Sequence, residues 1–285
     1  MWFLICVESN WRRTNQRSYS GTRKVSEGWV LTNTLTSDGK VGGKPRIAIP
    51  EPCSYDLEYS GRALPPYLRA VEAAGGEPVV VPLQSSPEEI ARLITSCAGI
   101  LLPGSKADVD PQKFNAKTHA QTAPADAPRD AADELLLQDA YNLRKPVFGI
   151  CYGLQSLNVW RTGSLMQHIE SNVDHSAGAR VEVAHKVVVE AGSLLAKEAL
   201  HGNELTAVPV NSSHHQSADV VGDGLRAVAY CAEDGVIEAI EGTTPGHYVL
   251  AVQWHPERTF ESDQVSSNLF RAFVDSAREW SKRNS

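Results

Sequence analysis

The sequence contains no paired-cysteine motif. Its cysteines are odd in number and widely spaced, and no two form a C-x-x-C pair; they are Cys6, Cys53, Cys97, Cys151 and Cys231. Neither a zinc ribbon nor a disulfide framework is expected from such a distribution. The simplest compartment for these thiols is reducing, so we expect a cytoplasmic protein.

Long apolar runs and a surplus of basic residues are also missing. No run of about 18 apolar residues occurs, so no membrane-spanning helix is expected. The apolar run at residues 3–7 is too short for a signal-peptide core, and no positive charge precedes it. Lys and Arg number 27 against 34 Asp and Glu, a net charge of −7. Because binding phosphates needs surplus cations, we expect neither a nucleic-acid nor a membrane partner.

The composition is that of a folded globular chain. Of 285 residues, 42% are hydrophobic and 21% are charged, and this length can bury a full core. Residues 1–44 differ from the rest, because they are polar, partly basic and without periodicity. We expect a disordered N-terminal extension over 1–44, or an upstream start codon chosen wrongly, with a functional basic tail as the alternative. Residues 45–285 are expected to form one domain.

The first half of that domain alternates strands with helices. Uniformly apolar strand segments lie at 46–50, 77–83, 98–103 and 145–150. Helical segments lie at 65–76, 87–94 and 129–143. This alternation predicts a parallel sheet covered on both faces.

The second half is richer in strands, several of which alternate as half-exposed antiparallel strands do. They are expected at 182–190, 205–210, 225–230, 236–241 and 248–255. An amphipathic helix is expected at 263–280, so the prediction is an α/β domain with a mixed sheet.

A cysteine at a strand-to-helix junction is the strongest chemical signal. The apolar strand before Gly149 leads into G-x-C-x-G, with Cys151 between Gly149 and Gly153. This is the cysteine form of a nucleophile elbow. The following helix favours a thiolate through its dipole, and the N–H of Tyr152 is available to an oxyanion. The alternative is a buried cysteine at a tight turn.

Two further signals complete a candidate site. His255 and Glu257 follow an apolar strand and lie two residues apart, so in an extended chain both point to the same side. A histidine with its own carboxylate suits a general base and its orienting group. Gly104 and Ser105 follow another strand, where a backbone N–H is expected to supply a second oxyanion donor.

These segments resemble one known family. The chain is similar to the γ-glutamyl-γ-aminobutyrate hydrolase family, peptidase family C26, within the class I glutamine amidotransferase-like superfamily. The segments that carry the similarity are LLPGSKADVDPQKF (101–114), GICYGLQSLNV (149–159), NSSHHQSAD (211–219) with EAIE (238–241), and AVQWHPE (251–257). The resemblance implies a flavodoxin-like three-layer αβα fold. Its central sheet would be mostly parallel, with an additional antiparallel strand-rich part in the C-terminal half.

The resemblance also implies roles for individual residues. Cys151 would be the nucleophile, His255 the base and Glu257 its orienter. Substrate and oxyanion contacts would come from Gly104, Ser105, Tyr152, Gln155, Asn211, Ser212 and His214. The substrate would be a small γ-glutamyl amide, cleaved through a thioester with no cofactor or metal. The amine and the oligomeric state stay open, and a homo-oligomer is compatible with the sequence.

No metal site is expected from the adjacent pair His214 and His215, because neighbours on a strand point to opposite faces. His185 is expected to be structural.

Three other functions remain open. The chain could be a glutaminase subunit that supplies ammonia to a synthase, an α/β-hydrolase with a different acid on His255, or a binding protein in which Cys151 and His255 lie far apart.

Overall fold

The computed structural model describes residues 43–201 and 207–284. The expectation for 1–44 therefore falls outside the described residues, apart from 43 and 44. Residues 43–285 form one compact unit. Among the described residues, no helix is long and apolar enough to cross a membrane.

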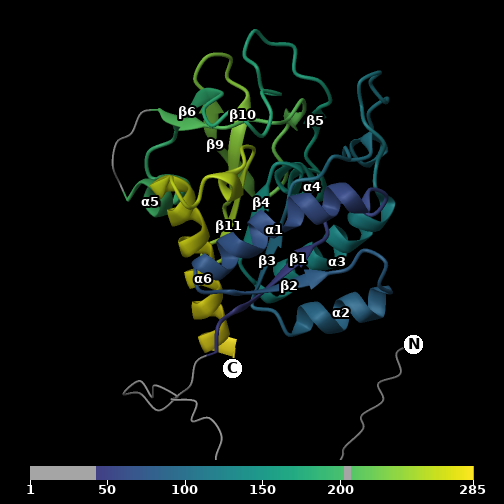
Figure 1. Cartoon of the computed structure of the whole chain (residues 1–285), viewed down its shortest axis with the longest axis vertical. Helices are drawn as coiled ribbons and strands as arrows, with labels where there is room; N and C mark the ends of the chain where they lie inside the picture. The colour runs from purple at the N-terminus through teal and green to yellow at the C-terminus, as the bar shows by residue number, and fades with distance from the viewer. Residues whose placement is uncertain (1–42, 202–206, 285) are drawn as a thin grey trace, which may run out of the picture. The chain divides into compact units, whose positions relative to one another are not determined.

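A nine-stranded sheet organises this unit (Figure 1). From edge to edge its strands are β2 (Glu77–Val81), β1 (Arg46–Pro50), β3 (Gly99–Leu102), β4 (Val147–Ile150), β11 (Val249–Val252), β10 (Ile237–Gly242), β9 (Leu225–Cys231), β6 (His185–Val189) and β7 (Val208–Val210). A separate pair is formed by β5 (Leu165–Met166) and β8 (Ser217–Ala218).

The helices are α1 (Leu57–Ala73), α2 (Pro87–Thr95), α3 (Ala127–Leu143), α4 (Tyr152–Trp160), α5 (Leu194–Leu200) and α6 (Gln264–Asn284), with short 3-10 turns η1 (Pro111–Phe114) and η2 (Pro256–Arg258).

The sheet has a parallel half and an antiparallel half. Strands β2, β1, β3, β4 and β11 pair in parallel, whereas β11–β10, β10–β9, β9–β6 and β6–β7 pair antiparallel. Figure 1 shows β6, β9 and β10 together at one end of the unit. The expectation of a mixed α/β fold is confirmed.

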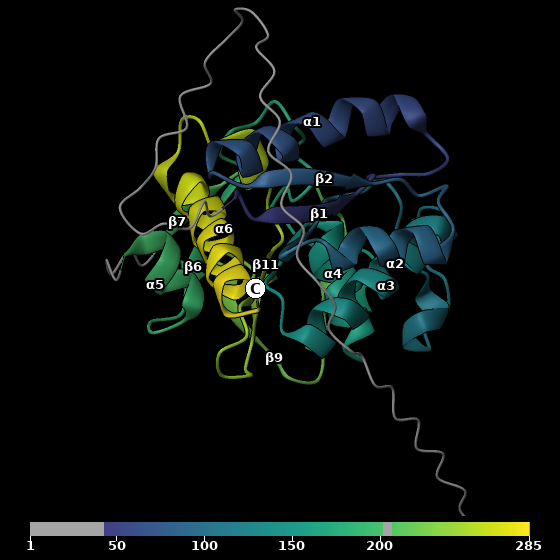
Figure 2. The same cartoon turned by 90° about the horizontal axis from the view of Figure 1, so that it is seen from below.

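The helices cover both faces of the sheet. Ile47 and Ile49 of β1 belong to the core cluster that contains α1, α5 and α6, whereas Ala48 faces the cluster that contains α2, α3 and α4. Figure 2 shows α1 and α2 on opposite sides of β1 and β2. Because neighbouring strand residues point to opposite faces, an uninterrupted apolar strand is what two helical layers require.

Two helices differ from the expectation. Helix α1 begins at Leu57, where Asp56 caps it by accepting from Tyr59 N, and it continues through Pro65 and Pro66. We expected a helix only over 65–76, from its apolar spacing, and the structure extends it past two prolines that each lack a backbone donor. Helix α5 was not predicted, although Ser193 caps its first turn and helix-forming residues follow.

The position of β11 places the candidate site. The last strand of the chain lies next to β4, with Ile150 paired to Val252. Cys151 and His255 therefore follow the carboxyl ends of two adjacent parallel strands, the edge where α/β sheets carry their sites.

Candidate active site

Cys151 occupies a strained turn between β4 and α4. Its φ is 54° and its ψ is −107°, a backbone conformation that residues other than glycine rarely adopt. Cys151 N donates to Val252 O at 2.8 Å, and Leu154 N donates to Cys151 O at 3.0 Å. Strand and helix are thus joined directly at the cysteine, as in a nucleophile elbow.

The two glycines beside Cys151 are required by close packing. A Cβ on Gly153 would lie 2.2 Å from Leu102 O, and one on Gly149 would lie 2.9 Å from Ala251 Cβ. A side chain at either position would therefore displace a neighbouring strand from the elbow.

His255 is held by Glu257. The two side chains are joined by a hydrogen bond of 2.8 Å between His255 Nδ1 and Glu257 Oε1, and both are buried. The contact forms because Pro256 starts the 3-10 turn η2, not because the chain stays extended as we expected. A carboxylate only accepts, so Nδ1 carries the proton and the neutral ring has a lone pair on Nε2. Nε2 is buried and has no hydrogen-bond partner among the described residues.

The charges of the site are set mainly by burial. Burial raises the pKa of Cys151 to about 12, partly offset by the positive charge of Arg258. Burial lowers the pKa of His255, against the raising effect of Glu257. For Glu257 burial acts upward, but the charge of His255 and its hydrogen bond outweigh it and lower the pKa. Burial therefore favours the thiol of Cys151 and the neutral ring of His255 in the free chain, whereas the Tyr152 N–H at the start of α4 acts toward the thiolate.

Gly104 lies between the cysteine and the histidine. A Cβ on Gly104 would lie 3.1 Å from His255 Cε1 and 3.6 Å from Cys151 Cβ. The two predicted reactive residues thus meet at one point, where the loop after β3 passes them. Gly104 N donates to the hydroxyl of Tyr67 at 3.0 Å. The Gly104 N–H is therefore occupied by the Tyr67 hydroxyl in this structure, and its role as an oxyanion donor stays a prediction.

Arg129 fixes the same peptide unit from the other side. Its Nη2 donates to Pro103 O at 2.7 Å, and the Pro103 carbonyl shares a peptide bond with Gly104 N. Arg129 is fully buried and pairs with Asp133 at 2.8 Å. Neither Arg129 nor Tyr67 was predicted to act on this peptide. The burial of Arg129 marks it as a residue with a specific role, and burial is seen in the structure and not in the sequence.

The other predicted oxyanion residues lie around Cys151. The backbone N–H of Tyr152 faces the Cys151 sulfur and acts to lower its pKa, against the larger effect of burial. The Tyr152 hydroxyl donates to Asp130 at 2.7 Å, away from the sulfur. Ser105 Oγ accepts from Ala107 N at 3.0 Å, which stabilises the turn after Gly104.

The predicted substrate residues bind protein groups in this structure. Asn211 brackets the backbone of His255, donating to its carbonyl and accepting from its N–H, both at 2.9 Å. Gln155 donates to Gln216 O and to Gln253 Oε1. Ser212 donates to the carbonyl of His175.

His214, the last of them, faces the Glu238 carboxylate and also acts electrostatically on His255. Its Nε2 is 3.6 Å from Glu238 Oε1. The roles of these four residues in substrate binding stay predictions.

A cavity opens onto the base side of the site. Its volume is about 410 Å³, and its lining includes His255, Glu257, Tyr67, Arg62 and Arg258. The two arginines bring positive charge to the mouth of this cavity. A ligand with a carboxylate would be favoured there.

The arrangement is suited to acyl transfer by a cysteine. It combines a cysteine on a strained elbow, a neutral imidazole oriented by a carboxylate, and backbone donors beside them. The acid in contact with His255 is Glu257, which argues against an α/β-hydrolase with a distant acid. The shared contact at Gly104 argues against a binding protein whose Cys151 and His255 lie apart.

The chain matches a known family. The sequence model of peptidase C26 matches residues 54–257. "Putative glutamine amidotransferase Rv2859c" of Mycobacterium tuberculosis is 37% identical over 224 residues, which cover 77% of this chain and 68% of that protein. "Gamma-glutamyl-gamma-aminobutyrate hydrolase PuuD" of Escherichia coli strain K12 is 33% identical over 219 residues, covering 73% of this chain and 83% of that protein.

A solved structure supports the fold. A Thermoplasma acidophilum crystal structure, described as a "putative gmp synthase subunit a protein", superposes with a TM-score of 0.59 and covers 85% of this chain and 98% of its own. Its sequence identity is 16%, so the similarity concerns the fold alone.

Proposed function

Because this chain belongs to the peptidase C26 family of glutamine amidotransferase-like hydrolases, we propose that it cleaves γ-glutamyl amide bonds with Cys151 as nucleophile. The observation that carries the proposal is the His255–Glu257 hydrogen bond of 2.8 Å, which leaves His255 Nε2 without a partner on the side of Gly104 and Cys151. Such a base is what a buried thiol needs, because only the thiolate attacks a carbonyl carbon.

In the acylation step, His255 Nε2 takes the proton of Cys151 while the sulfur attacks the γ-carbonyl carbon. The carbonyl oxygen becomes an oxyanion, which the N–H groups of Gly104 and Tyr152 stabilise. For this, the Gly104 donor must exchange the Tyr67 hydroxyl for the substrate oxygen. The C–N bond then breaks, and the amine leaves with the proton from His255.

In the second step, a water molecule gives a proton to His255 and attacks the thioester carbon. The C–S bond breaks, glutamate is released, and the sulfur regains its proton from His255. Glu257 keeps the ring in one tautomer and stabilises its charged form in both steps.

The substrate class follows from the relatives and from the cavity. The Escherichia coli relative is named for γ-glutamyl-γ-aminobutyrate. Arg62 and Arg258 at the cavity mouth suit an amine portion that carries a carboxylate. We therefore place γ-glutamyl-γ-aminobutyrate first among the substrates, ahead of γ-glutamyl amines without an acid group.

The test is a panel of γ-glutamyl amides assayed for glutamate release by the full chain. We expect turnover of γ-glutamyl-γ-aminobutyrate and a γ-glutamyl adduct on Cys151, detected by mass spectrometry after acid quenching. Cys151→Ala should lower kcat at least about 1,000-fold, as loss of a covalent nucleophile does.

The matched control is Cys97→Ala, which removes another buried free thiol and should leave kcat unchanged. If Cys151→Ala keeps more than about a tenth of the activity, the nucleophile is wrongly assigned.

A glutaminase subunit is the second candidate, because the mycobacterial relative is named as a glutamine amidotransferase. It uses the same chemistry on free glutamine and delivers ammonia to a synthase. Glutamine hydrolysis that appears only when a partner protein is added, with no turnover of γ-glutamyl amines, would favour it.

A further inference from the structure

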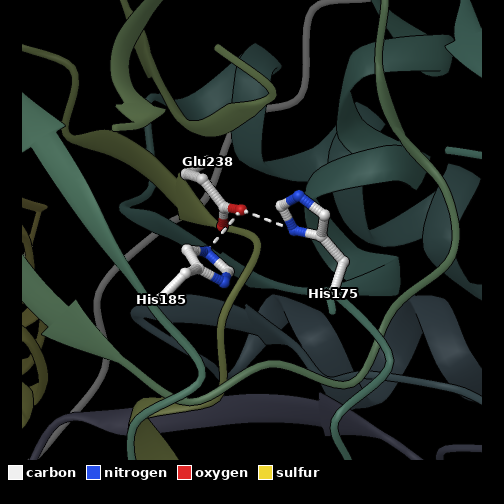
Figure 3. A group of neighbouring side chains, drawn as sticks. All are labelled: His175, His185 and Glu238. Carbon is white, nitrogen blue, oxygen red and sulfur yellow. Dashed lines mark hydrogen bonds and ion pairs between the residues drawn. The ribbon is translucent and has the colours of Figure 1, made fainter. Parts of the chain in front are cut away.

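Three imidazoles surround one carboxylate oxygen in the antiparallel half of the sheet. Glu238 Oε1 lies 2.9 Å from His185 Nε2, 3.3 Å from His175 Nδ1 and 3.6 Å from His214 Nε2. Figure 3 shows His175 and His185 directed at the Glu238 carboxylate. All four side chains are buried, and Glu238 is completely so. The ring nitrogens are therefore not screened from the carboxylate by water.

Two of the rings are fixed in a tautomer by their other nitrogen. His175 Nε2 lies 2.9 Å from Asp234 Oδ2, and His214 Nδ1 lies 2.9 Å from Gln216 O. A carboxylate and a carbonyl only accept, so each of these nitrogens carries the proton. The nitrogen facing Glu238 then has a lone pair in the neutral ring.

Lone pairs directed at a carboxylate oxygen repel it unless positive charge lies between them. His175 Nδ1, His214 Nε2 and Glu238 Oε2 are all buried without a hydrogen-bond partner among the described residues. Buried polar atoms without partners are rare, and each one points to a missing proton or ligand. One divalent cation would supply the charge to all of them at once.

We propose that His175, His185, His214 and Glu238 bind a zinc ion. The ligand atoms of His175, His185 and Glu238 all lie within 4.8 Å of one another. A shift of the His214 ring, whose Nε2 lies 3.6 Å from Glu238 Oε1, would bring in a fourth donor. Three imidazoles and one carboxylate suit zinc, whereas magnesium and calcium prefer oxygen ligands. Asp234 and Gln216 O supply the outer hydrogen bonds that commonly orient histidine ligands of zinc.

A second group of donors competes for His175. His175, Cys231 and Asp234 also lie within 4.8 Å of one another. However, Cys231 Sγ donates to Glu233 Oε2 at 3.2 Å, and Asp234 accepts from Ser171. These two groups already have partners, whereas His175 Nδ1, His214 Nε2 and Glu238 Oε2 have none among the described residues, so the zinc belongs at Glu238.

The four proposed ligands come from separate parts of the chain. His185 begins β6, Glu238 lies in β10, His175 lies in the loop before β6, and His214 follows β7. With four protein ligands the site is closed, which is typical of structural zinc. Zinc would hold the segment that contains His214 against the sheet, and with it Asn211, which brackets His255.

The test is metal analysis of the full chain, purified without a polyhistidine tag or chelator after growth with added zinc. We expect about one zinc ion per chain by plasma mass spectrometry, retained through dialysis. Removing zinc with a strong chelator should lower Tm, and adding Zn²⁺ alone should restore it while Mg²⁺ should not. Cobalt(II) in place of zinc should give the visible spectrum of a tetrahedral site.

Variants then locate the ion. Glu238→Gln and His175→Ala should lower zinc occupancy at least tenfold. Two controls should retain the ion: His215→Ala removes the adjacent histidine, which contacts Asp108, and Cys231→Ser removes the competing donor. If Cys231→Ser loses the ion and Glu238→Gln keeps it, the assignment is wrong.

The unmodified chain alone is also decisive, whatever the variants do on folding. If it holds less than about a tenth of an ion and its Tm responds to neither chelator nor Zn²⁺, there is no zinc site.

Discussion

Arg129 and Tyr67 hold one peptide unit from opposite sides. Arg129 Nη2 donates to Pro103 O at 2.7 Å, and Tyr67 Oη accepts from Gly104 N at 3.0 Å. Rotation of this peptide would turn the Gly104 N–H away from the Tyr67 hydroxyl and break both hydrogen bonds. Arg129 is thus a positioning residue for a donor that acts on the substrate oxygen in the proposed reaction.

We expect Arg129→Lys to lower kcat about tenfold with little change in KM. Lysine keeps the charge opposite Asp133 but lacks the planar fork that reaches both Pro52 O and Pro103 O. Loss of a whole oxyanion donor costs about 100- to 1,000-fold, so a misplaced donor should cost less. Steady-state kinetics and Tm of the same preparation measure the effect.

Arg161→Lys provides the control for that change. Arg161 also donates to a backbone carbonyl, that of Asp223, and lies over aromatic rings, but it is at the far end of α4. It should leave kcat unchanged, and an equal loss in both variants would contradict the role of Arg129.

We expect Gly104→Ala to abolish most activity without unfolding the protein. The added Cβ would lie 3.0 Å from the Tyr67 hydroxyl and 3.1 Å from His255 Cε1. Both contacts are tighter than normal, so the imidazole or the loop must shift by a few tenths of an ångström. Because a misplacement of about 1 Å costs about 100-fold in rate, we expect a loss of about tenfold or more. Far-ultraviolet circular dichroism and Tm establish folding, and kcat gives the effect.

Gly61→Ala is the matched glycine substitution. Nothing lies within 4 Å of a Cβ built on Gly61, which is in helix α1. It should keep full activity and gain up to about 1 kcal/mol of stability, because alanine is the better helix former. Full activity in Gly104→Ala would contradict the close approach of Gly104 to Tyr67 and His255.

The sequence predicted where the strands lie along the chain better than it predicted which strands pair with each other. Apolar runs identified β1, β3 and β4, because a strand buried on both faces must be apolar throughout. The insertion of β11 between β4 and β10 depends on contacts across the whole chain, which no local pattern contains. That insertion brings His255 beside Cys151.

The sequence predicted the contact between His255 and Glu257, which are close in the chain. It did not predict the cluster around Glu238, whose residues are far apart in the chain. His255 and Glu257 are two residues apart, so almost any turn after β11 lets them meet, including the 3-10 turn that forms. His175, His185, His214 and Glu238 are spread over four segments. Viewed one at a time along the chain, these residues carry no shared signal, because we expected His185 to be structural and His214 to contact the substrate.

The pH dependence of kcat/KM should report the buried histidine. Burial lowers the pKa of His255, and only the unprotonated ring accepts the thiol proton. Activity should therefore be lost as pH falls through a value below about 6.5, the ordinary histidine pKa. An acid limb centred above about 7 would contradict a neutral buried base.

Glu257→Gln should move that acid limb further down in pH. The Glu257 carboxylate raises the pKa of His255, against burial, so its removal lets the pKa fall. The plateau kcat should drop at least about 100-fold, because the amide does not stabilise the imidazolium or fix its tautomer. The control is Glu279→Gln, at an exposed position in α6. A rise in the pH of the acid limb in Glu257→Gln would contradict the proposed role of Glu257.

Substitution of Asn211 tests whether this residue positions His255 or contacts the substrate, as the sequence predicted. Its amide brackets the His255 backbone with two hydrogen bonds of 2.9 Å, so Asn211→Ala frees the base to move. We expect kcat to fall at least about tenfold while KM changes less than about twofold, because orientation matters most in the transition state. A raised KM at constant kcat would instead assign Asn211 to substrate binding.

Asn158→Ala separates this effect from a general loss of stability. Asn158 is also a buried asparagine that bridges backbone groups, donating to Ser164 O and Val220 O and accepting from Gly222 N. Both variants leave buried backbone atoms unpaired and should lose about 1–3 kcal/mol of stability. Only the bonds of Asn211 reach the residue that takes the proton, so only Asn211→Ala should lower kcat at a temperature where both variants are folded.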